Sequence, residues 1–266
     1  MIDPRLIEAV ETLIAAHSRS GSVPLIAISG AQGSGKTTLA RAAAARTGAA
    51  HLSLDDVYLT RAERDALART VHPLFATRGP PGTHDLGLLH RVIDALSRAG
   101  SDARTPLPVF DKRADDRLAP EDWPVFTGRP AAILLDGWCL GAMPHEAAAL
   151  IAPVNDLERQ QDPDGRWRRA VNDELAGPCR HLFARFDALL FLRAPTFDGV
   201  LDWRCEQEAG LMGLAPADLP ATERARLAGF IGYFERITRS MIDGWVVADV
   251  VVSLDRERRV TGIERL

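Results

Sequence analysis

Lysine is almost absent from this sequence of 266 residues. Its 32 basic residues are 30 arginines and two lysines, Lys36 and Lys112. Asp and Glu number 36, which gives a net charge of −4, and the arginines are scattered among these acids. Nucleic-acid binding depends on a concentrated basic surface, so this balance disfavours a nucleic-acid partner. Where nearly every cation is arginine, the two lysines become candidates for roles that a planar guanidinium fills badly.

Cysteines and long apolar runs are also scarce. The three cysteines, Cys139, Cys179 and Cys205, have no pair spacing, which indicates reduced thiols rather than disulfides or a zinc site. No uninterrupted apolar run approaches ~18 residues, so no membrane span is expected. The first residues are charged and amphipathic and lack the apolar core of a signal peptide. We therefore expect a cytoplasmic protein with no membrane partner; its oligomeric state stays open, with a monomer as the simpler expectation.

Short apolar strands alternate with helical segments along the chain. This alternation predicts an α/β fold whose mainly parallel sheet is flanked by helices. No repeat or linker divides the chain, so a single domain over 1–266 is expected, with insertions at about 61–130 and 138–180. Strands are expected at 24–29, 49–54, 107–110, 131–136, 188–192 and 246–254. Helices are expected at 4–14, 37–47, 61–71, 85–99, from about 168, and at 197–212 and 223–243, with 111–130 as loop.

Residues 30–37 match the phosphate-binding pattern G-x-x-x-x-G-K-[ST] in full. The segment follows a predicted strand and begins a predicted helix, as this pattern requires, so the fold is expected to be a three-layer P-loop NTPase. Glycines let backbone N–H groups turn toward phosphate oxygens, and the helix N-terminus adds partial positive charge. Lys36 is expected to reach the β- and γ-phosphates of ATP, and Thr37 to hold Mg²⁺. The predicted nucleotide-binding residues are Gly30, Ala31, Gln32, Gly33, Ser34, Gly35, Lys36, Thr37 and Thr38.

Two predicted strands end in acidic residues. Asp55 and Asp56 directly follow the strand at 49–54, and Asp136 ends the strand at 131–136. Open α/β sheets bind ligands beyond the carboxyl ends of their strands. Asp136 is expected to hold Mg²⁺, directly or through water, and Asp55 to accept the proton of an attacking hydroxyl. The alternative is that these acids cap helices or lie in solvated turns, which suits Asp56 best.

Polar residues of the predicted insertions could bind an acceptor and complete the site. Arg78 and Lys112 would neutralise an anionic acceptor, and His84 and Asp85 would hydrogen-bond its hydroxyls. Asp85 equally suits a helix N-cap, and His84 a surface position. Arg204 is the candidate lid arginine, because phosphoryl transfer develops negative charge that an arginine stabilises.

Seven segments of the chain, taken in order, resemble the glycerate kinases of the plant D-glycerate 3-kinase type. They are SGAQGSGKTTL, SLDDVYLT, RGPPGTHDL, PVFDK, LLDGWCLG, WRCEQE and ADVVVSLD. That group belongs to the P-loop kinases that include phosphoribulokinase, uridine kinase and pantothenate kinase, so the resemblance implies the same wider group for this chain. The resemblance, over roughly residues 25–255, implies ATP, Mg²⁺ and a small hydroxy acid, with D-glycerate as the first acceptor. It also places Asp55 at the position of the catalytic acid and Asp136 at the second acidic position, which is often Glu in relatives.

Two other functions stay open on the sequence. A kinase for a nucleoside or another small metabolite would need stacking aromatics, which Tyr58, Phe110 and Trp138 could supply. An ATP-binding regulatory protein is the second alternative, because a P-loop fold alone does not fix a function. A GTPase is disfavoured, since neither lysine lies in an Asn/Thr-Lys-x-Asp motif.

Overall fold

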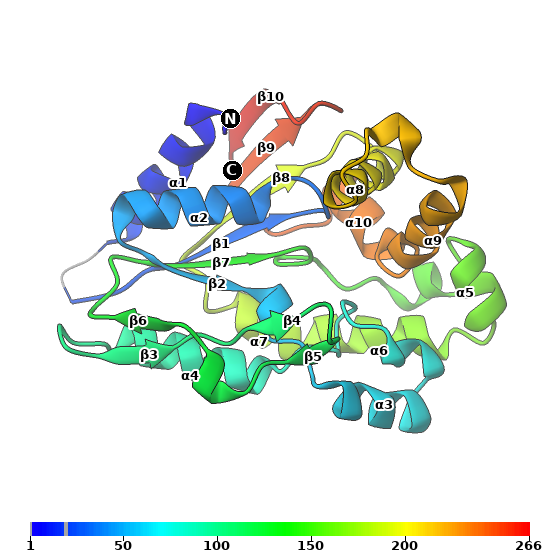
Figure 1. Cartoon of the computed structure of the whole chain (residues 1–266), viewed down its shortest axis with the longest axis horizontal. Helices are drawn as coiled ribbons and strands as arrows, with labels where there is room; N and C mark the ends of the chain where they lie inside the picture. Colours follow the sequence, from blue (N-terminus) through cyan, green and yellow to red (C-terminus); the bar gives the residue numbers. More distant parts are fainter. Residues whose placement is uncertain (1, 19–20) are drawn as a thin grey trace.

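The chain is built on a central sheet of six strands. The computed structural model describes residues 2–18 and 21–266 (Figure 1). The strand order is β10-β9-β8-β1-β7-β2, and β10 runs antiparallel to β9 while the other pairs are parallel. The strands are β1 (Leu25–Gly30), β2 (Ala50–Ser53), β7 (Ile133–Gly137), β8 (Ala188–Arg193), β9 (Val250–Leu254) and β10 (Val260–Arg265). The carboxyl ends of the parallel strands therefore meet at one edge of the sheet.

Helices cover both faces of this sheet, which makes three layers. Helices α1 (Pro4–His17) and α2 (Lys36–Thr47) pack on one face, and α4 (Leu86–Ser97) and α6 (Arg166–Glu174) on the other (Figure 1). Successive strand residues point to opposite faces, so Ile26 and Ile28 join one apolar core while Ala27 joins the other. This is why the strands are nearly continuous apolar runs rather than alternating ones.

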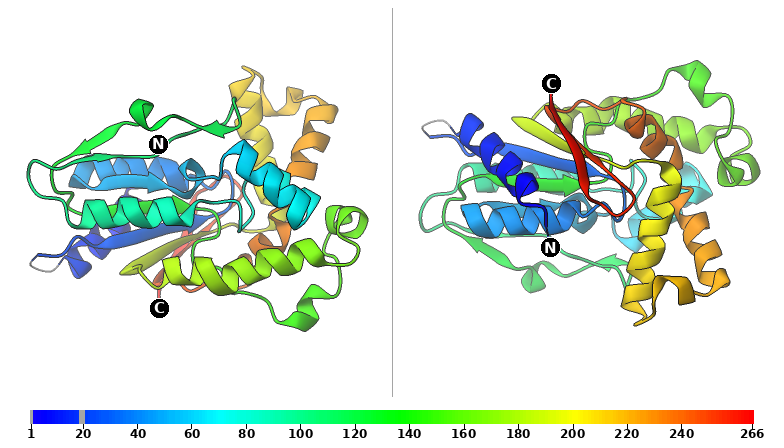
Figure 2. Two further views of the ribbon diagram at one scale, coloured as in Figure 1. Left: turned by 90° about the horizontal axis from the view of Figure 1, so that it is seen from below. Right: turned by 90° about the horizontal axis from the view of Figure 1, so that it is seen from above.

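Smaller elements surround the carboxyl edge of the sheet. Helices α8 and α9 project from that end, and the insertion that carries α3 and two short strand pairs lies on another side (Figure 2). In the strand pairs, β3 (Arg104–Pro106) bonds to β6 (Val125–Thr127), and β4 (Phe110–Asp111) to β5 (Asp116–Arg117). The remaining helices are α3 (Arg61–Thr70), α5 (Asp156–Gln161), α7 (Arg180–Phe183), α8 (Phe197–Leu211), α9 (Ala221–Ile231) and α10 (Glu235–Ile242).

The three-layer α/β prediction is confirmed, but some predicted elements are wrong. The helix expected at 223–243 is two helices, α9 and α10, and Asn155 donates to the carbonyl of Gly232 at 2.8 Å in the break between them. The strand expected at 107–110 is mostly a connection between β3 and β4. The loop expected at 111–130 contains β5 and β6, which are too short to produce a periodic pattern. The edge strand β10, largely exposed, was not expected at all.

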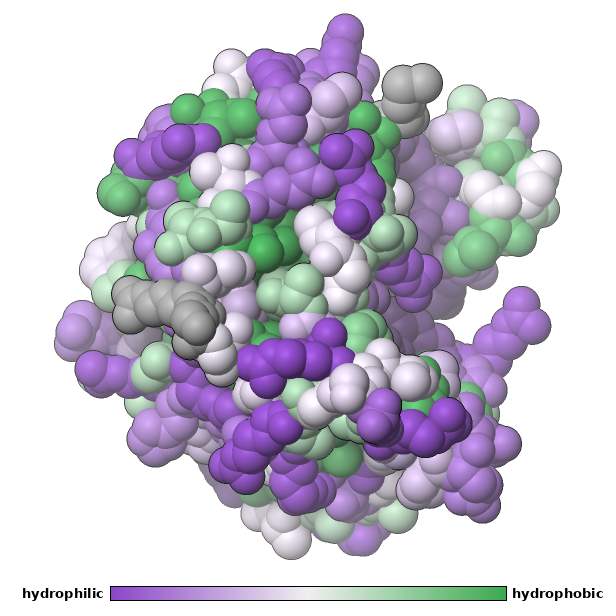
Figure 3. All heavy atoms as spheres, turned by 90° about the vertical axis from the view of Figure 1, so that its left-hand side faces the viewer, coloured by the Kyte–Doolittle hydropathy of each residue, from purple (hydrophilic) through white to green (hydrophobic). Residues whose placement is uncertain are grey.

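The surface of the described residues is mixed in polarity. Figure 3 shows the face at the left of Figure 1, where hydrophilic side chains are spread between smaller apolar areas. Within residues 2–18 and 21–266, no helix has both the length and the apolar character needed to cross a membrane.

A buried ion pair joins α5 to α6. Asp162 Oδ2 lies 3.0 Å from Arg168 Nη1, and neither side chain is more than 3% exposed. Asp162 also accepts the backbone N–H groups of Trp167 and Arg168, which caps α6 in place of Gly165, a residue without a side chain. Arg168 in turn donates to the carbonyl of Leu150 at 2.7 Å. One pair therefore fixes the path of the chain from 150 to 168.

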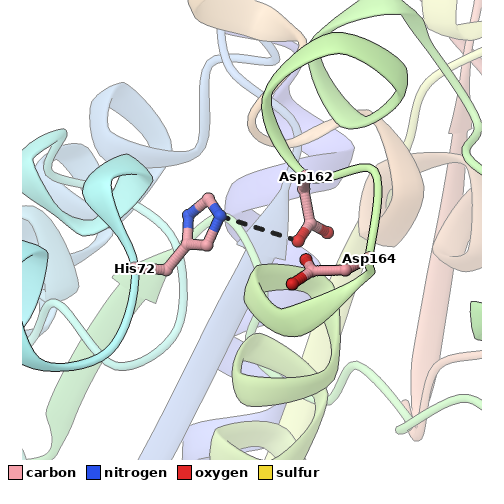
Figure 4. Close-up of side chains that lie close together, drawn as sticks. All are labelled: His72, Asp162 and Asp164. Carbon is pink, nitrogen blue, oxygen red and sulfur yellow. Dashed lines mark ion pairs between the residues drawn. The ribbon is translucent and has the colours of Figure 1, made fainter.

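His72 and Asp164 lie beside this pair. One ring nitrogen of His72 and one carboxylate oxygen each of Asp162 and Asp164 lie within 4.8 Å of one another (Figure 4). A histidine with two carboxylates can bind a metal. Here, however, His72 Nδ1 accepts the backbone N–H of Leu74 at 3.3 Å, which leaves the ring proton on Nε2. That nitrogen lies 3.8 Å from Asp162, whose two oxygens are already engaged by α6. These hydrogen bonds give the cluster a structural role.

Replacing Asp162 by Asn is expected to lower the free energy of unfolding by about 3–5 kcal/mol, because Arg168 would keep a buried charge without its partner. Urea denaturation measures this change. The matched control is Asp156→Asn, since the Asp156 side chain is 77% exposed and pairs with Arg159 on the helix surface. That control is expected to change stability by less than about 1 kcal/mol. Equal effects of the two substitutions would contradict the structural role.

Candidate active site

A cleft of about 890 Å³ lies where β1, β2 and β7 end. Its lining comes from the glycine-rich turn at 32–38, from Asp55 and Tyr58 after β2, and from Trp138 after β7. Helices α8 and α9 close one side, and the insertion with β4 and β5 closes another. The volume is at the upper end of the range for ligand sites, ~300–1,000 Å³.

The glycine-rich turn has the backbone that phosphate binding requires. Gly33 and Gly35 have φ of +78° and +89°, in the left-handed region that favours glycine. Ser34 N donates to the carbonyl of Ala31 at 3.2 Å, and α2 begins at Lys36. Of the predicted nucleotide-binding residues, Gly30, Ala31 and Ser34 are buried in the turn. The others, Gln32, Gly33, Gly35, Lys36, Thr37 and Thr38, line the cleft.

Both carboxylate oxygens of Asp55 are hydrogen-bonded. Tyr58 donates its hydroxyl to Oδ1 at 2.6 Å, and Lys112 Nζ lies 2.8 Å from Oδ2. Burial alone would raise the pKa of Asp55, but the charges of Lys112 and Lys36 and these two hydrogen bonds hold the pKa well below its usual value. Asp55 is therefore ionised, and on the side of the cleft Lys112 occupies its Oδ2.

Asp136 is fully buried at the end of β7, next to β1 in the sheet. Ser53 donates its hydroxyl to Oδ1 at 2.6 Å, and His51 Nε2 lies 3.4 Å from Oδ2. Burial alone would raise the pKa of Asp136, yet these two partners and the charge of Lys36 lower it below its usual value. Thr37 lines the cleft, whereas Asp136 is fully buried outside its lining, with its carboxylate oxygens bonded to Ser53 and His51 of β2. Oxygen atoms of this kind are the ligands that Mg²⁺ prefers, but Asp136 could contact an ion in the cleft only through water.

The predicted acceptor residues divide into two groups. Arg78 and Lys112 line the cleft, where Arg78 pairs with Asp115 and Lys112 with Asp55. Asp85 lies outside the lining, since its Oδ1 accepts the N–H of Leu88 to cap α4 and its Oδ2 pairs with Arg117 at 3.0 Å.

His84 is also outside the lining and is only 8% exposed. Its ring lies 4.9 Å from the ring of Tyr58, and the buried Nε2 has no hydrogen-bond partner among the described residues. Burial lowers the pKa of His84 to about 4, so the ring is neutral. His84 therefore packs against the Tyr58 ring and is not at the surface of the cleft, where the predicted contact with an acceptor would require it.

The predicted lid arginine, Arg204, lines the cleft from α8. Its guanidinium donates to Gln207 at 3.0 Å and pairs with Glu208 at 3.1 Å. Arg226, on α9, pairs with the other oxygen of Glu208 at 3.1 Å. One glutamate therefore holds two cleft-lining arginines from two different helices.

Further residues line the cleft that the sequence does not predict as parts of the site. Tyr58 is predicted only as a ring that could stack, although its spacing of three from Asp55 is compatible with the observed contact. Arg226 and Arg258 had no local signal, because each is one of 30 arginines and reaches the cleft only through the tertiary fold.

The fold of this chain is similar to the folds of several solved structures over almost the whole length of the chain. D-glycerate 3-kinase from Cryptococcus neoformans var. grubii matches with a TM-score of 0.78 at 21% identity, covering 99% of this chain and 98% of that one. The YGR205w protein matches with a TM-score of 0.67 at 20% identity, covering 98% and 95%. The suggested fructose transport system kinase of Silicibacter sp. TM1040 matches with a TM-score of 0.60 at 22% identity, covering 94% and 98%.

The chain has the three-layer α/β fold of a P-loop NTPase. At identities near 20%, this likeness to solved structures shows the fold that the glycine-rich turn and the strand pattern predict. No protein-family model matches the sequence, and no curated protein matches it.

The buried His84 is expected to make stability fall in mild acid. Its pKa of about 4 lies below the ordinary value of 6.5, so the unfolded chain takes up a proton between pH 6.5 and 4 that the folded chain does not. Stability contributed in this way is complete above pH 6.5 and is lost as the pH falls toward 4. Urea denaturation measures how far the free energy of unfolding falls between pH 7 and pH 5. In His84→Phe this fall is expected to be about 2 kcal/mol smaller than in the unsubstituted protein. The same loss in both proteins would contradict this assignment.

Proposed function

We propose that this protein is an ATP-dependent kinase that transfers the γ-phosphoryl group to a hydroxyl of a small hydroxy acid, with D-glycerate as the first candidate. The observation that carries the proposal is the position of Asp55, which lines the same cleft as Lys36 and the glycine-rich turn. A carboxylate facing a phosphate cradle across one cleft is the arrangement that in-line transfer to a hydroxyl needs. The similarity in fold to D-glycerate 3-kinase supports the acceptor. The buried free thiols accord with a cytoplasmic location.

In this proposal the glycine-rich turn binds the phosphates of ATP. The N–H groups of the turn and the N-terminus of α2 surround the phosphate oxygens, and Lys36 extends between the β- and γ-phosphates. Thr37 and, through water, Asp136 would hold Mg²⁺, which when bound neutralises charge on those oxygens.

Asp55 orients the acceptor hydroxyl and takes its proton. Tyr58 holds Oδ1 at 2.6 Å, which leaves Oδ2 as the oxygen for the substrate once Lys112 moves from it. The carboxylate of a hydroxy acid is the group that can draw Lys112 away, since it offers the same ammonium a second anion. Arg78, which pairs with Asp115 beside the cleft, is positioned to bind the same carboxylate. The acceptor thus exposes the base that acts on it.

The lid arginine acts by a similar exchange of partners. Arg204 is held by Glu208 at 3.1 Å, and this pair is partly exposed to the cleft. The charge that develops on the transferring phosphoryl group is a stronger partner than one carboxylate, so Arg204 would turn from Glu208 to phosphate during transfer.

A nucleoside acceptor is less well supported than a hydroxy acid. The three rings that could stack on a base, those of Tyr58, Phe110 and Trp138, are each no more than 5% exposed. Tyr58 packs edge to face on Phe110, and Trp138 on Phe234, with ring centres 5.1 and 4.9 Å apart. Each ring therefore already packs against another ring of the protein and leaves little surface for a base.

The direct test is ADP production from ATP and Mg²⁺ in a coupled assay, with D-glycerate, uridine and pantothenate compared as acceptors. Stimulation by D-glycerate alone is the expected result. Stimulation by uridine alone would move the proposal to a nucleoside kinase. Hydrolysis of ATP without stimulation by any acceptor would instead favour an ATP-binding regulatory protein.

Asp55→Asn is expected to lower kcat by about 10²–10⁴-fold, because an amide cannot take the proton of the hydroxyl. The Kd for ATP, measured by calorimetric titration, is expected to change by less than about 3-fold, which corresponds to less than 1 kcal/mol of binding free energy. Asp56→Asn is the matched control, since Asp56 accepts the backbone N–H of Phe110 at 3.4 Å and lies outside the cleft lining. Near-normal turnover of Asp55→Asn would show that Asp55 is not the base.

A further inference from the structure

Arg258 reaches the candidate nucleotide site from the far end of the chain. It lies in the turn that joins β9 to β10, where Asp255 accepts the backbone N–H of Arg258 at 3.0 Å. Its φ is +63°, a left-handed value that residues other than glycine rarely adopt. Figure 2, seen from above, shows the tip of this red hairpin beside the yellow helix α8. A strained backbone at an exposed turn calls for a compensating contact of the side chain.

The side chain of Arg258 makes three such contacts. Its Nε donates to the backbone carbonyl of Gly33 at 2.7 Å, and Nη2 lies 2.7 Å from Glu206. The guanidinium also lies over the ring of Trp203, with its carbon 5.2 Å from the ring centre. Trp203 in turn donates its indole N–H to the carbonyl of Arg256 at 2.6 Å, so the turn is fastened to α8 from both sides.

The contact with Gly33 fixes the orientation of one peptide group in the glycine-rich turn, which is the P-loop. A phosphate cradle works when its N–H groups face the anion and its carbonyl oxygens face elsewhere. Arg258 holds the Gly33 oxygen through a charged donor, while Trp203 closes the other side, since a Cβ on Gly33 would lie 2.7 Å from its Cβ. If that oxygen were released, the peptide could turn its negative end toward the phosphates.

We propose that Arg258 is a positioning residue of the nucleotide site, which holds the Gly33 carbonyl away from the phosphates and so keeps the P-loop ready to bind ATP or ADP. The inference rests on the proposed function only for the identity of the nucleotide. Glu206 is a secondary partner that orients the guanidinium, and the hydrogen bond to Gly33 carries the effect.

Arg258→Gly is the most informative variant, because glycine suits a φ of +63° and removes the side chain without straining the turn. Calorimetric titration with ATP and with ADP is expected to show Kd values raised about 10- to 100-fold, as for loss of a hydrogen bond to a charged donor. In the kinase assay, the KM for ATP is expected to rise with the Kd, while the KM for the acceptor stays unchanged. A merely structural role would not separate the two substrates in this way.

Two further variants locate the effect. Arg259→Gly is the matched control from the same turn, since Arg259 is 72% exposed and pairs only with Asp255 and Glu257 among the described residues. It is expected to leave both Kd values unchanged. Glu206→Gln keeps the Gly33 contact, and its Kd values are expected to stay within about 3-fold of the unsubstituted protein, a difference below 1 kcal/mol.

The outcomes distinguish this inference from the proposed function. Unchanged Kd values for ATP and ADP in Arg258→Gly would overturn the positioning role, and so would a loss in Glu206→Gln as large as that in Arg258→Gly. Neither result depends on phosphorylation of any acceptor. If no acceptor is phosphorylated but nucleotide affinity falls in Arg258→Gly alone, the proposed function fails and the positioning role stands.

Discussion

The ion pair between Lys112 and Asp55 is the contact on which the two halves of the site depend. Asp55 comes from the end of β2 in the central sheet, whereas Lys112 comes from the insertion that carries β4 and β5. The pair, 2.8 Å long, joins the sheet to the insertion across the cleft and, together with Lys36 and Tyr58, keeps the pKa of the carboxyl low. The same pair occupies Oδ2 of Asp55, the oxygen that the acceptor hydroxyl would need under the proposed function. In that proposal, the carboxylate of the acceptor exposes this oxygen by drawing Lys112 away.

The scarcity of lysine acquires a physical meaning in this arrangement. Both lysines, Lys36 and Lys112, line the cleft. Buried arginines have structural work instead, as in Arg64, which is 1% exposed and donates to the carbonyls of Ala76 and Asp115 at 2.8 and 2.7 Å. A guanidinium fixes several acceptors in one plane, while an ammonium is a compact charge that can exchange partners. In the proposed function, Lys112 must exchange Asp55 for the carboxylate of the acceptor.

The sequence was informative wherever function follows from local order along the chain. The P-loop, the sheet strands and the acids at their ends are each set by neighbours a few residues apart, so the fold and the positions of Lys36 and Asp55 could be predicted. His84 and Asp85 show the limit, because a capping interaction and a ring packed under Tyr58 use the same residue types as a substrate site. Arg258 shows it more strongly, since its partner Gly33 is 225 residues away and no pattern links them.

The role of Lys112 is tested most directly by the ratio of ADP release with and without D-glycerate in Lys112→Gln. Lys112 is expected to do two things, to cover Asp55 when no acceptor is present and to bind the acceptor carboxylate when it is. We expect that the substitution lowers acceptor-stimulated turnover and raises acceptor-free hydrolysis of ATP, so that the ratio falls sharply. A ratio equal to that of the unsubstituted protein would contradict it.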